Sequence, residues 1–82
     1  MTGYNFNQDL STENFTILVD QDSLYGFFEH NEYGDELGGG LWFDIAGELV
    51  DYDGVYELPK EVGRALRDVG YWGSEVTQDL EV

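Results

Sequence analysis

The chain has 82 residues, no cysteine and a formal net charge of −15, with eighteen acidic residues against three basic ones. This length predicts a single domain, residues 1–82, and the lack of cysteine excludes disulfides and zinc–thiolate sites. The strong negative charge argues against direct binding to nucleic acid or to an anionic membrane.

The N-terminal half is predicted to form strands. Residues 1–13 are polar with few apolar anchors, which predicts a loosely ordered arm. Residues 14–20 alternate between apolar and polar, the period of a strand, and an aromatic-rich second strand is expected over 24–31. The stretch 32–40, EYGDELGGG, is predicted to be a long hairpin loop.

The C-terminal half is predicted to contain two further strands and one helix. A third strand is expected over 41–46, with Ile45 on its apolar face, and a short fourth strand within 49–56. From Pro59 to Val69 the apolar spacing becomes helical, and residues 75–82 are expected to be a last strand or an acidic tail. The predicted fold class is α+β: an antiparallel sheet of three to four strands packed against one α-helix.

The charges are unevenly distributed along the chain. From Met1 to Pro59 there are thirteen acidic residues and no Lys or Arg, and all three basic residues lie in the predicted helix. Carboxylates on one face of a strand repeat about every 6.6–6.8 Å, so they can form negative rows comparable to the phosphates of DNA. The candidate partner-binding residues are therefore the acids of the sheet and its turns, with two tyrosines among them that we expect to be exposed: Asp20, Asp22, Glu29, Glu32, Tyr33, Asp35, Glu36, Asp51, Tyr52, Asp53 and Glu57.

Motifs for catalysis, cofactors or metals do not fit the chain. An EF-hand loop starting at Asp51 would have Val55 and Val62 at ligand positions. The glycine-rich stretch lacks the Lys of a phosphate-binding loop, and His30, the single histidine, is expected to be an ordinary surface residue. We therefore predict no enzyme activity, no catalytic residue, no cofactor and no metal.

Location and assembly are predicted only in outline. No apolar run approaches membrane-spanning length, and the N-terminus lacks the features of a secretory signal, so a cytoplasmic protein is expected. Either a monomer or a homodimer fits the sequence, because a strand edge or Trp72 offers a surface for self-association.

In size, charge and layout the whole chain resembles the small acidic inhibitors of host defence that phages encode. These include anti-CRISPR proteins, anti-restriction DNA mimics and uracil-DNA glycosylase inhibitors. The stretch LVDYDGVYELPKEVGRALRDVGYW also resembles short proteins from prophages. The resemblance implies stoichiometric inhibition, in which acids take the place of phosphates against the Lys and Arg of a nucleic-acid-binding protein, with a CRISPR–Cas effector as the favoured partner.

Four other interpretations stay open from the sequence, of which a calcium-binding module ranks last. The target could be another DNA-binding enzyme, such as a restriction, nuclease or repair enzyme. The chain could instead be a non-catalytic module that binds a basic protein without displacing nucleic acid. The acidity could also reflect adaptation to high salt, with no acidic binding surface.

Overall fold

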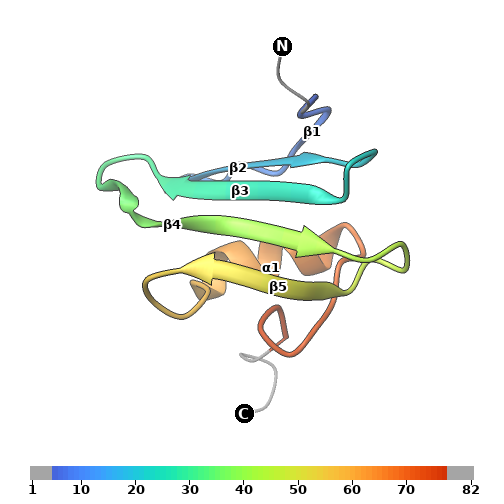
Figure 1. Ribbon diagram of the computed structural model, residues 1–82. Coiled ribbons are helices and arrows are strands. Elements are labelled where there is room, and N and C mark those ends of the chain that lie inside the picture. The colour runs from blue at the N-terminus through green and yellow to red at the C-terminus, as the bar shows by residue number, and fades with distance from the viewer. Residues whose placement is uncertain (1–4, 78–82) are drawn as a thin grey trace.

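The computed structural model describes residues 5–77, which form a five-stranded antiparallel sheet and one helix. The strands are paired in chain order, so each is joined to its neighbour by a hairpin connection (Figure 1). Their bounds are β1 Gln8–Asp9, β2 Phe15–Asp20, β3 Tyr25–His30, β4 Gly34–Phe43 and β5 Leu49–Gly54, and the helix is α1 Lys60–Asp68. The predicted α+β class is confirmed, with five strands rather than three to four.

Two of these elements differ from the sequence prediction. Residues Gln8–Asp9, within the segment predicted to be a loose arm, pair with Leu18 and Val19 as β1. β4 begins at Gly34, so most of the predicted long loop is strand, and the β3–β4 connection is only residues 31–33. β4 ends at Phe43, which leaves Ile45 in the following turn, 94% exposed instead of on an apolar face.

The core lies between the sheet and α1, which Figure 1 shows behind the strands. The alternation in β2 turns Phe15, Ile17 and Val19 into this layer, and α1 contributes Val62 and Leu66. The cluster is completed by Phe28, Leu41, Phe43, Leu49, Leu58 and Val76.

α1 begins after Pro59, whose carbonyl accepts the amide hydrogen of Gly63 at 2.9 Å. Proline suits this position because its fixed φ matches the start of a helix. Glu61 in the first turn accepts hydrogen bonds from the side chains of Thr12 and Asn14, so it connects the helix to the segment before β2. Gly70, at φ 102°, ends the helix in the left-handed conformation that glycine adopts without strain.

The C-terminal part of the described chain returns to the sheet. Trp72 forms a parallel bridge with Glu48, and the Tyr71 ring lies 4.3 Å from that of Phe43. Residues 74–77 form a turn; the remainder of the predicted tail or strand lies outside the described residues. Among residues 5–77, no helix is long and apolar enough to cross a bilayer.

Candidate binding surface

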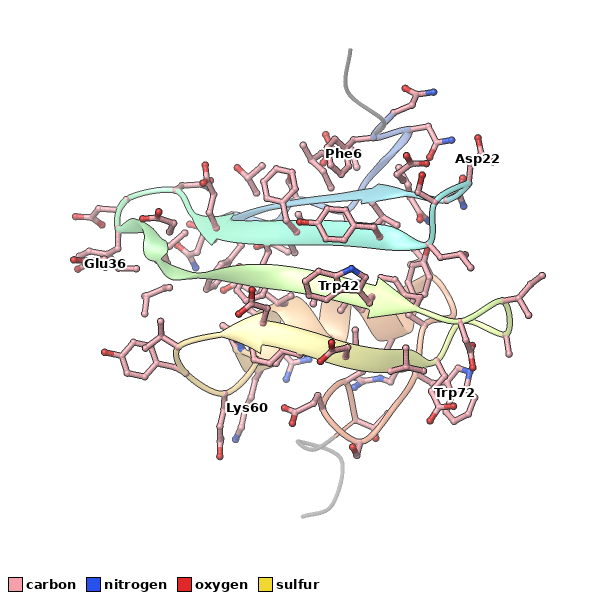
Figure 2. All side chains as sticks on the ribbon, viewed as in Figure 1. Phe6, Asp22, Glu36, Trp42, Lys60 and Trp72 are labelled. Atoms are coloured by element: carbon pink, nitrogen blue, oxygen red, sulfur yellow. The ribbon has the colours of Figure 1, made fainter. Side chains whose placement is uncertain are left out.

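The sheet has a second face, opposite α1, which we call the open face. Strand register places on it Thr16 and Leu18 of β2, Tyr25, Phe27 and Glu29 of β3, Gly40 and Trp42 of β4, and Asp51 and Asp53 of β5. Figure 2 shows Trp42 on this face, turned away from the helix. The open face therefore combines aromatic rings with carboxylates.

The aromatic side chains of the open face form a row. Phe6 precedes β1, and its ring packs against two rings of β3. The ring centroid of Phe6 is 5.1 Å from that of Phe27 and 6.3 Å from that of Tyr25. The Tyr25 ring is in turn 5.1 Å from the ring of Trp42. These four residues are the aromatic row; all of them are partly exposed. None of the four is among the candidate partner-binding residues predicted from the sequence.

A signal for the row was present in the sequence. Phe27 and Phe28 are adjacent in one strand, and adjacent strand residues point to opposite faces. Only one of the two rings can therefore enter a one-sided core, and the structure buries Phe28. Two further aromatic residues, Tyr56 and Trp72, are also exposed, at 64% and 45%.

The glycines of β4 make room for aromatic rings on both faces. A Cβ on Gly40 would lie 2.8 Å from the Trp42 ring on the open face, and one on Gly39 would lie 3.0 Å from the Tyr52 ring on the helix side. The Tyr52 ring also stacks on that of Phe28, and its hydroxyl donates to the Tyr56 carbonyl. Tyr52 is thus partly buried, contrary to our expectation of an exposed side chain.

The predicted acidic residues fall into three separate groups. Glu29, Asp51 and Asp53 lie on the open face, and β1 adds the exposed Asp9, paired with Leu18. Glu32, Asp35, Glu36 and the exposed Tyr33 surround the β3–β4 turn, and Glu57 lies at the same end of the sheet, where it lines a small cleft with Leu37 and Gly38. Asp22 is in the β2–β3 turn at the other end (Figure 2).

The two turn groups are well separated, although they are close in sequence. The six residues of β3 lie between the two turns, and at about 3.3 Å per residue they span roughly 20 Å. The acids between positions 20 and 36 therefore do not form one patch. The open face carries carboxylates on three strands: Asp9 on the edge strand β1, Glu29 on the central strand β3, and Asp51 and Asp53 on the other edge strand, β5.

Asp20 does not belong to the surface, because its side chain is only 1% exposed. Its carboxylate accepts the backbone amide hydrogens of Asn5 at 2.8 Å, Asp22 at 3.0 Å and Ser23 at 3.2 Å. The Asn5 amide is the main cause that lowers the pKa of Asp20, burial opposes it, and the amides of Ser23 and Asp22 lower it further. Asp20 therefore stabilises the β2–β3 turn and anchors the segment that carries Phe6.

We expect Asp20→Asn to lower the melting temperature at pH 7 by roughly 5–10 °C, because an amide satisfies these donors less well. A lowered folded-state pKa gives stability that is present above the unfolded-state pKa and lost as the pH falls through the folded value. The difference from wild type should therefore shrink below about pH 4. Thermal melts from pH 2 to 7 test this, with the exposed Asp22→Asn as control; a difference independent of pH contradicts the assignment.

The single histidine, His30, has a structural role in a turn. His30 Nδ1 accepts the amide hydrogens of Glu32 and Tyr33, at 3.0 and 3.2 Å, and so orders the β3–β4 turn. Within residues 5–77, no group of three or more His, Asp or Glu is arranged to hold a metal ion. An open pocket of about 300 Å³ lies beside β5, lined by Leu49, Val50, Asp51, Tyr52, Ser74 and Glu75.

No protein family, curated protein or solved structure matches the chain.

Proposed function

We propose that this protein is a non-catalytic inhibitor that mimics nucleic acid and occupies the nucleic-acid-binding site of a basic protein in the cytoplasm of the host cell. A CRISPR–Cas effector is the favoured target, as in the anti-CRISPR proteins that the chain resembles. The observation that supports this most is the separation of charge between the two layers. All three basic residues are in α1, together with Glu61 and Asp68, whereas the sheet and its turns carry acidic residues and no Lys or Arg.

The open face has suitable spacing for phosphate mimicry. Asp51 and Asp53 are two residues apart on one face of β5, a separation of about 6.6–6.8 Å. Asp9 and Glu29 add charge from two other strands of the same face. Arginine and lysine side chains that normally contact phosphates would donate charge-assisted hydrogen bonds to these carboxylates.

The test is a competition assay with a CRISPR effector complex and its fluorescently labelled target DNA. We expect the protein to prevent DNA binding at near-stoichiometric amounts in 50 mM NaCl. Inhibition should weaken about tenfold or more in 300 mM NaCl, because salt screens attraction between exposed charges. If effector complexes and nucleases all keep their DNA at low salt, the proposal is wrong. If the protein displaces DNA from a nuclease or repair enzyme but not from a CRISPR effector, it is an inhibitor of that other DNA-binding enzyme.

Two variants that lose the same number of negative charges test whether the open face or the β3–β4 turn binds the target. One replaces the open-face acids, Glu29→Gln, Asp51→Asn and Asp53→Asn, and the other replaces the turn acids, Glu32→Gln, Asp35→Asn and Glu36→Gln. We expect the first to weaken inhibition about tenfold or more and the second only about threefold. Equal effects would show attraction by net charge without a defined site. A complex that forms with DNA still bound would favour the non-displacing module.

A further inference from the structure

The open face carries more than phosphate-like charge, because its acids lie beside the aromatic row. Asp51 is directly opposite Trp42 in the β4–β5 register, and Asp53 is opposite Gly40, over which the Trp42 ring lies. Side chains directly opposite on adjacent strands have Cβ atoms about 4.5–5.5 Å apart. The indole and the two carboxylates can therefore contact one bound group together.

The Asp51 carboxylate is already oriented. Its Oδ1 atom accepts the backbone amide hydrogen of Tyr52 at 2.8 Å, which leaves the second oxygen for a partner. Trp42 is also positioned by its neighbours. Its ring packs against the Tyr25 ring and lies over Gly40, which has no side chain to displace it. A site fixed before binding loses less conformational entropy on binding than a mobile one does.

Aromatic rings beside acids have a counterpart in single-stranded nucleic acid but not in a duplex. Inside a duplex the base faces are stacked and hidden, and a protein meets phosphates and base edges. In a single strand the base faces are accessible, and proteins bind them by stacking arginine or aromatic side chains while basic groups hold the phosphates. The open face offers ring surfaces and carboxylates in the same combination.

We propose that the open face mimics single-stranded nucleic acid and receives arginine side chains from the partner's single-strand-binding groove. This inference rests on the proposed function and specifies its binding chemistry. A guanidinium group stacks on Trp42 and donates hydrogen bonds to Asp51 or Asp53. Arginine suits this site better than lysine, because its planar group both stacks on a ring and donates to a carboxylate.

Charge complementarity selects this occupant. The open face has exposed carboxylates on β1, β3 and β5, and the sheet contains no Lys or Arg. A nucleic acid would be repelled by these acids, whereas a cationic, arginine-rich groove is attracted to them. An arginine on an exposed aromatic ring binds about two- to fivefold better than the same charge without stacking.

The experiment compares fluorescently labelled nona-arginine and nona-lysine peptides binding to the intact protein, measured by anisotropy. Both peptides carry nine charges, so their net-charge attraction is equal and a difference in affinity reports contacts specific to the guanidinium group. We expect nona-arginine to bind about two- to fivefold more tightly in 150 mM NaCl. Trp42→Leu should abolish this preference while nona-lysine binding is retained, and Trp42→Phe should retain most of it. Trp72→Leu, at the other exposed tryptophan, is the control and should leave the preference unchanged.

Each outcome supports or overturns the inference. Equal binding of the two peptides by the wild-type protein overturns it without any variant. An equal loss of preference in Trp42→Leu and Trp72→Leu also overturns it. If the preference is absent but DNA is still displaced from the effector, the protein mimics phosphates alone and the proposed function stands. If the preference is present without displacement, the arginine site stands and the inhibitory function is wrong.

Discussion

Replacing Gly38 with alanine is expected to lower the free energy of unfolding by about 3 kcal/mol. A Cβ at this position would lie 2.5 Å from the backbone oxygen of Phe28, and backbone cannot rotate away as a side-chain tip can. The β3–β4 pairing would have to shift at its irregular point, between Phe28 and His30. In a domain of this size the change corresponds to a fall of roughly 12–24 °C in melting temperature, measurable by circular dichroism.

Gly34→Ala provides the matched control for this substitution. Gly34 has a positive φ of 65°, but an added Cβ meets nothing within 4 Å, so only backbone strain of about 1 kcal/mol is expected. If residues 32–40 were the flexible loop that the sequence suggested, Gly38→Ala would instead stabilise the protein by about 0.4–1 kcal/mol, because alanine restricts the unfolded chain. The sign of the effect therefore separates strand from loop.

Phe28→Ala is expected to lower the free energy of unfolding by about 3–5 kcal/mol. The side chain is 1% exposed and lies within the core, where its ring is 6.0 Å from Phe15 and 6.1 Å from Tyr52. Removing it leaves a cavity that backbone and neighbouring rings fill only in part. Urea denaturation gives the free energy directly, because a small single domain is expected to unfold in one step.

Phe27→Ala is the matched control, because Phe27 is the adjacent phenylalanine but lies on the open face of the sheet. Phe27 is partly exposed and packs on Phe6, so its loss is expected to cost about 1–2 kcal/mol. Two adjacent phenylalanines in one strand would then differ severalfold in their contribution to stability. Equal losses would mean that the open face is covered as fully as the helix side, and the binding surface would have to be sought elsewhere.

The elements that the sequence predicted well are those with local periodicity. Alternation in β2 and the spacing of Val62 and Leu66 in α1 each appear within a few residues, because a single buried face selects them. β4 was recognised only in its last three residues for the opposite reason. Its three glycines from Gly38 to Gly40 resemble a loop, yet Gly38 and Gly39 are required by the backbone of β3 and β5, and Gly40 by the Trp42 ring of β4 itself. Contacts of that kind depend on register, which local sequence does not reveal.

The candidate site was predictable in composition but not in arrangement. The sequence identified Asp51 and Asp53 as members of an acidic surface, and register brings them beside Trp42. It also included Asp20, whose carboxylate is turned inward by three backbone amides that belong to the following turn and to Asn5. Two of these donors are local, at Asp22 and Ser23, whereas the amide of Asn5 is fifteen residues away and depends on the tertiary fold.

The separation of charge between sheet and helix also gives the molecule a permanent electric dipole. Lys60 and Arg64 are exposed on α1, whereas the exposed acids of β1, β3 and β5 lie on the other side of the thin, two-layered body. In the field of a cationic partner, such a molecule experiences a torque that turns the open face forward before contact. A cationic partner would therefore meet the open face in a larger share of its encounters.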